Sequence, residues 1–125
     1  MAYESKLYLV EKTSVKNEYG KTWAKIVAMY DLCNMGSGNF YNLFSTYESR
    51  ANRDSGCIIS IGGVSVHKDK YGSPLTQATV AETIAALKAD LNTADPYRRI
   101  PPVLAMLEAI DESKWDGITV LHYGY

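Results

Sequence analysis

Two long apolar runs near the N-terminus restrict this chain to folds that contain a β-sheet. In the first run, Lys6–Thr13, Leu7 and Leu9 point to the same face because successive side chains in a strand alternate. The second run, Thr22–Leu32, is apolar on both faces, which is typical of a central strand. A short loop ending in Gly20 separates the two runs, so the pattern predicts a β-hairpin.

A second hairpin is predicted further along the chain. The apolar runs Cys57–Ile61 and Val64–His67 flank Gly62-Gly63, a two-residue connection suited to the positive φ angles of a primed turn. Between the two hairpins, the apolar positions of Asn39–Tyr47 recur at helical spacing. We therefore expect a short helix there, with Asn39 as its N-cap.

The C-terminal half predicts two longer helices and a final strand. Thr79 and Glu82 stand three residues apart before an apolar run, the arrangement of a capping box, and that helix is expected to end near Asn92. A second helix is expected to begin at Pro101-Pro102, since proline is well tolerated at the first helical position. The run Ile118–Tyr123 then predicts the last strand.

These elements give the order ββαββααβ, which is not a regular alternation of strands and helices. We expect an α+β fold in which helices pack on one face of a mainly antiparallel sheet. The 125 residues fit a single domain, residues 1–125, and we find no repeat or linker.

The charge balance excludes the simplest nucleic-acid-binding class. The chain carries 13 Lys+Arg and 14 Asp+Glu, a net charge of −1, so no direct DNA binding is expected. The acidic side chains around the end of the last helix have the distribution of a solvated surface. No signal peptide or membrane span is visible, and Cys33 and Cys57 lie in apolar segments as buried thiols would. We expect a cytoplasmic protein with no membrane partner.

Few residues suggest catalysis. His67 and His122 each lie at the end of a predicted strand, and either could act as a general base in a small hydrolase, with Cys33 or Cys57 as nucleophile. No known motif surrounds them, and the four residues lack the spacing of a zinc site. The expected assignment is therefore no catalytic residue, no metal and no cofactor.

Binding is better supported by the composition. Tyrosine accounts for 10 aromatic residues against 2 Phe and 2 Trp, and tyrosine is enriched at interfaces because it offers apolar area with a polar tip. Several tyrosines lie outside the predicted core, among them Tyr3 and Tyr19. The candidate binding residues are aromatic or basic: Tyr71, Tyr97, Arg98, Arg99 and Tyr125. The two arginines would bind an anion through their guanidinium groups, or would pair with nearby carboxylates of this chain.

Four segments carry a resemblance: SKLYLVEKT, WAKIVAMYDLCNMG, YRRIPPVLAML and WDGITVLHYGY. The chain resembles the small orphan proteins encoded by phages and prophages of bacteria. Such proteins are often inhibitors of bacterial defence, including anti-CRISPR proteins and sponges for nucleotide signals. The resemblance implies an anti-defence protein that acts by binding.

The leading expectation is a non-enzymatic binding protein, an anti-CRISPR-like inhibitor that contacts a host defence protein and itself forms a homo-oligomer. A sponge for a nucleotide second messenger is one alternative, with Arg98 and Arg99 on phosphate and a tyrosine stacked on the base. The hydrolase that uses His67 or His122 is the other.

Overall fold

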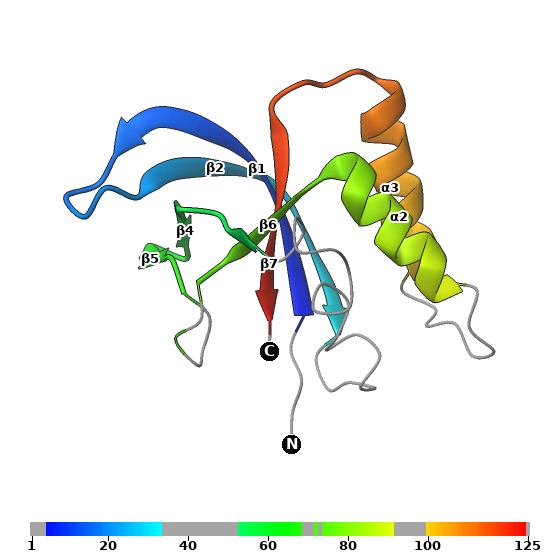
Figure 1. Cartoon of the computed structure of the whole chain (residues 1–125), viewed down its shortest axis with the longest axis horizontal. Coiled ribbons are helices and arrows are strands. Elements are labelled where there is room, and N and C mark those ends of the chain that lie inside the picture. The colour runs from blue at the N-terminus through cyan, green and yellow to red at the C-terminus, as the bar shows by residue number, and fades with distance from the viewer. Residues whose placement is uncertain (1–4, 34–52, 69–71, 73, 92–99, 125) are drawn as a thin grey trace.

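Seven strands and two helices make up the part of the chain that the structure, a computed structural model, describes: residues 5–33, 53–68, 72, 74–91 and 100–124 (Figure 1). Their bounds in chain order are β1 Ser5–Lys16, β2 Thr22–Cys33, β3 Arg53–Asp54, β4 Cys57–Ile61, β5 Val64–Val66, β6 Thr76–Thr79, α2 Val80–Leu91, α3 Ile100–Glu112 and β7 Ile118–Gly124. Both helices are much shorter than a bilayer crossing requires, so no helix in the described part of the chain can span a membrane.

The sheet has the strand order β3-β6-β7-β1-β2-β4-β5. β1 lies between β2 and β7 and pairs antiparallel with both, so the N-terminal and C-terminal strands are neighbours. Every strand pair is antiparallel except β2–β4, where only Thr22 and Trp23 lie opposite Cys57 and Ile58. The mainly antiparallel α+β class expected from the sequence is confirmed.

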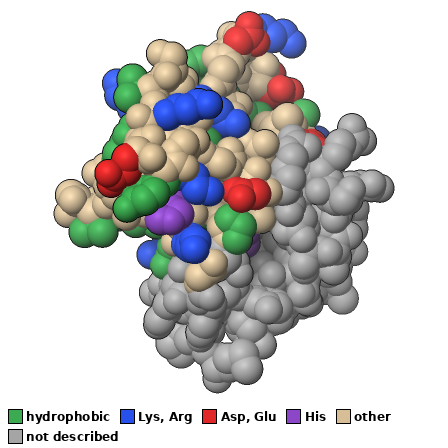
Figure 2. Space-filling view, turned by 60° about the vertical axis from the view of Figure 1, so that its left-hand side comes forward, with side chains coloured by type: hydrophobic (Ala, Val, Ile, Leu, Met, Phe, Trp, Pro, Cys, Tyr) green, Lys and Arg blue, Asp and Glu red, His purple; other side chains and the backbone are tan. Residues whose placement is uncertain are grey.

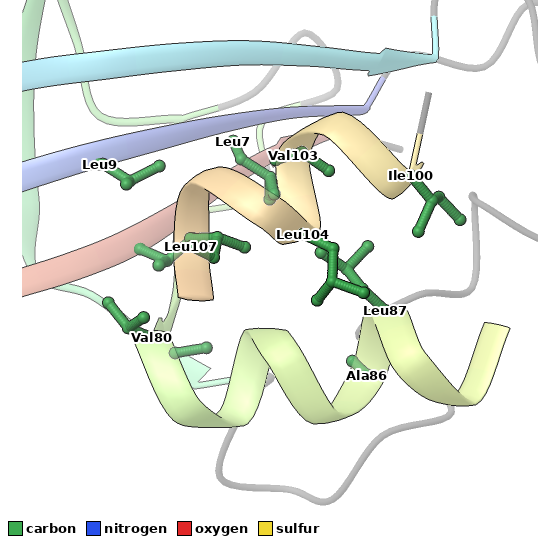
Figure 3. Close-up of a cluster of buried hydrophobic side chains, with 11 residues drawn as sticks. Leu7, Leu9, Val80, Ala86, Leu87, Ile100, Val103, Leu104 and Leu107 are labelled. Atoms are coloured by element: carbon green, nitrogen blue, oxygen red, sulfur yellow. The ribbon is translucent and has the colours of Figure 1, made fainter. Parts of the chain in front are cut away.

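One face of the sheet is covered by α2 and α3 (Figures 1 and 3). Leu7, Leu9 and Val120 project from the central strands on this face, because alternate residues of a strand share a side. They pack against the apolar stripes of the two helices, whose buried residues are Val80, Ala86, Leu87, Ile100, Val103, Leu104 and Leu107. Both described helices thus lie on one face, as expected.

The opposite face is covered by the β4–β5 hairpin. Tyr8, Val10 and Leu121 alternate with the residues of the helix side and point away from the helices. They pack against Cys57 and Ile59 of β4, although β4 is not a sheet neighbour of β1 or β7. The hairpin therefore folds across the sheet, and the central strands are buried on both sides.

Two strands depart from the expected element order. β3 and β6 were not predicted, because they are short and polar and form only by pairing with strands distant in sequence. β6 pairs with β7 from Thr76↔His122 to Thr79↔Thr119. β3 pairs in turn with β6. The helix expected over Asn39–Tyr47 lies outside the described residues, so the order ββαββααβ is not confirmed as written.

The turn between β4 and β5 and the cap of α2 have the geometry expected from the sequence. Gly62 and Gly63 have φ angles of 58° and 83°, which are the positive values of the primed turn expected between β4 and β5. At the start of α2, the Glu82 amide donates to Thr79 Oγ1 at 3.0 Å, and the Thr79 amide donates to Glu82 Oε1 at 2.9 Å. The capping box is confirmed.

Removing this cap should destabilise the protein measurably. Thr79→Ala deletes the oxygen that accepts the Glu82 amide, and we expect the free energy of unfolding to fall by about 1 kcal/mol. Thr79→Ser keeps the hydroxyl and should retain most of the stability. Urea unfolding followed by circular dichroism measures both changes, and equal losses in the two variants would contradict the capping role.

Candidate functional site

The binding residues proposed from the sequence cannot be placed. Tyr71, Tyr97, Arg98, Arg99 and Tyr125 all lie outside the described residues. The anion-binding role of Arg98 and Arg99 and the contact role of the three tyrosines therefore stay predictions.

The structure does not bring Cys57 and His122 together. Cys57 belongs to the cluster beneath the β4–β5 hairpin. His122 lies opposite Leu7 on β1 and alternates with Leu121, so it is on the helix side of the sheet. A Cys–His catalytic pair made from these two residues is excluded by the sheet between them. Cys33 has no described side-chain environment, and His67 is half-buried directly after β5.

Burial sets the protonation of both residues. It raises the pKa of the Cys57 thiol, which is a free and buried cysteine, so the reactive thiolate is disfavoured. It lowers the pKa of His122 to about 4, so the imidazole is neutral near pH 7. Among the described residues no group of three or more His, Cys, Asp or Glu is placed to hold a metal ion.

The feature that stands out on the described surface is the outer half of the first hairpin, here called the arm (residues 12–25). β7 pairs with β1 only as far as Glu11, and beyond that point the hairpin continues away from the helices (Figure 1). At its far end, Val15 is 59% exposed and Tyr19 is 79% exposed. Large apolar side chains that are exposed to solvent to this extent are candidates for contact with another molecule.

The end of the arm is held in one conformation by hydrogen bonds. Asn17 Oδ1 accepts the amides of Tyr19 at 3.0 Å and of Lys21 at 2.8 Å. The Asn17 amide donates to the Lys21 carbonyl at 2.8 Å, and Gly20 completes the turn with a φ of 78°. A glycine is suited to this position because other residues are strained at positive φ. Tyr19 is therefore presented on a structured turn.

The arm is rich in lysine. Four lysines and one glutamate lie within it: Lys12, Lys16, Glu18, Lys21 and Lys25. The Lys12 ammonium donates to Gln77 Oε1 at 2.8 Å and ties the base of the arm to β6. Figure 2 shows Lys and Arg side chains spread over the described part of the face that it presents, among hydrophobic ones. The arm is thus locally basic although the whole chain has a net charge of −1.

Comparison with known proteins gave a clear result. No protein-family model, no curated protein and no solved structure matches this chain.

Sequence reasoning identified only part of this site. Tyr19 was among the tyrosines expected outside the core, and its exposure confirms that. Val15 was not singled out. The turn ending in Gly20 was expected from the sequence, but the extension of the hairpin past β7 was not, because it depends on where the β1–β7 pairing stops.

Proposed function

We propose that the protein is a non-enzymatic binding protein that inhibits a larger protein by contact, with the arm as its binding element. The observation that carries the proposal is Tyr19, 79% exposed on a hydrogen-bonded turn at the end of the arm. In line with the resemblance to phage proteins, the target we propose is a bacterial immune effector.

A tyrosine on a rigid turn has the properties of a binding hot spot. Tyr and Trp are enriched among the residues that contribute most to protein–protein affinity. The Asn17 side chain fixes the turn before binding, so little conformational entropy remains to be lost when a partner encloses Tyr19. Val15, nearby in sequence on the same arm, extends the apolar contact area.

The lysines indicate the chemistry of the partner surface. Lys16 and Lys25 are exposed, and Lys21 is half-buried. Lys16 and Lys21 lie within three residues of Tyr19 and outnumber the adjacent Glu18. The end of the arm is therefore basic, which favours a partner cleft bordered by Asp and Glu. Such rim charges speed association and select the partner more than they add affinity. We therefore propose an acidic cleft of the target protein as the binding site for the arm.

A capture experiment with matched variants tests the proposal. Tagged wild-type protein is used to capture partners from a bacterial extract, and a captured protein is purified and titrated against each variant by calorimetry. Tyr19→Ala should weaken binding by about 30-fold, the loss of a hot-spot side chain. Asn17→Ala keeps Tyr19 but loosens the turn, and about tenfold weaker binding is expected.

The control is Val64→Ala, which removes a 62% exposed apolar side chain from β5, outside the arm. It should bind as tightly as the wild type. Tyr19→Ala should also unfold within about 0.5 kcal/mol of the wild type, since the ring is exposed. Unchanged binding by Tyr19→Ala would refute the proposal.

A further inference from the structure

A cleft on the helix side of the molecule suggests a second binding site. It lies where the start of α2, the end of α3 and the turn before β7 meet, and its volume is about 250 Å³. Its apolar lining comes from Val80, Ile110 and Ile118. The arm is built from β1 and β2, so the cleft and the arm share no residue.

One aromatic and two acidic residues also line the cleft. Trp115, on the turn between α3 and β7, is 48% exposed. Asp111 and Asp116 line the same cleft, and their side chains have no hydrogen bond or ion pair with the described residues. An exposed aromatic ring and two carboxylates without a partner among the described residues, placed around an apolar hollow, are complementary to a cation with an apolar stem.

The other charged groups of the cleft do not cancel this character. Lys114 lines it too, yet its ammonium forms no ion pair with Asp111 or Asp116. At the N-terminus of α2, the Glu82 carboxylate accepts the Thr79 amide in the capping box and so offsets the positive end of the helix dipole. The end of α3 carries the partial negative charge of a helix C-terminus, which favours a cation.

We propose that this cleft binds an arginine side chain of a partner protein. The planar guanidinium can stack on Trp115 while its N–H groups donate to Asp111 and Asp116, and its methylene stem lies over the apolar lining. A lysine fits less well, because its compact ammonium is more strongly hydrated and does not stack in this way. This proposal is independent of the one made for the arm, since the two sites share no residue.

The test follows the indole N–H signal of Trp115 by nuclear magnetic resonance during titration with N-acetyl-arginine amide. Trp23, the other tryptophan, lies on the arm and serves as an internal control. We expect the Trp115 signal to shift with saturation and a Kd of about 1–10 mM, the affinity of a few exposed contacts. The Trp23 signal should stay in place. N-acetyl-citrulline amide, the neutral analogue of nearly the same shape, should give no saturable shift.

Two variants should change the affinity in opposite directions. Asp111→Asn with Asp116→Asn should weaken arginine binding by about fivefold, and Lys114→Met should strengthen it by about twofold because it removes a repelling charge. The substituted residues are all exposed, and the same spectra report whether each variant remains folded. Equal shifts with citrulline, equal affinity for N-acetyl-lysine amide, or unchanged binding by the double Asn variant would each overturn the proposal.

Discussion

Leu107→Ala is expected to lower the free energy of unfolding by about 3 kcal/mol. Leu107 is fully buried in the cluster between the helices and the sheet (Figure 3). Truncating a leucine in such a site removes its transfer free energy and leaves a cavity that neighbours fill only in part. Leu7, Leu9 and Val120 project from strands held by pairing on both sides, so they have little freedom to move into the space.

Urea unfolding monitored by circular dichroism measures this loss. Ala105→Gln is the matched control, since Ala105 is on the same helix and exposed, and glutamine is also a good helix former. The control should unfold within about 0.5 kcal/mol of the wild type. If both variants lose the same stability, α3 does not pack on the sheet through this face.

Acidification from pH 6.5 to pH 4 should destabilise the protein through His122. Burial lowers its pKa from 6.5 to about 4, so the folded state holds the imidazole neutral while the unfolded state protonates it. The unfolded state therefore binds more protons in this range. The contribution of the neutral His122 to the free energy of unfolding is fully present above pH 6.5 and is lost as the pH falls toward 4. A shift of this size corresponds to a loss of about 3 kcal/mol by pH 4.

Replacing the histidine isolates this effect. His122→Gln cannot titrate, so its stability should change much less than that of the wild type between pH 6.5 and pH 5, where most carboxylates are still ionised. Chemical unfolding at several pH values gives the two curves. Parallel curves for wild type and variant would show that His122 is not the group responsible.

Local elements of the fold were predictable because their signals are short-range. The β1–β2 hairpin, the Gly62-Gly63 turn and the Thr79–Glu82 cap each depend on residues a few positions apart. Alternation or spacing within one window is enough to identify such elements. The apolar stripes of α2 and α3 were recognisable in the same way.

The candidate sites were harder to predict. Tyr19 could be singled out as a surface tyrosine. Its place at the end of an arm could not be predicted, because the arm extends past β7 only where the β1–β7 pairing stops, at Glu11. Asp111 and Asp116 have the sequence pattern of an ordinary solvated surface. The cleft exists because β7 returns the chain beside α2, which places Ile118 near Val80.

Periodicity, turn residues and caps determined where the hairpins, the last two helices and the final strand form, since those choices depend on the local backbone and on which side of an element is apolar. Pairing between distant strands decided the rest: β7 beside β1, the polar strand β6 at its side, and the β4–β5 hairpin across the second face. Such pairings leave little trace in one sequence because any apolar strand can pair with several others. Only packing all the buried faces at once selects a single arrangement.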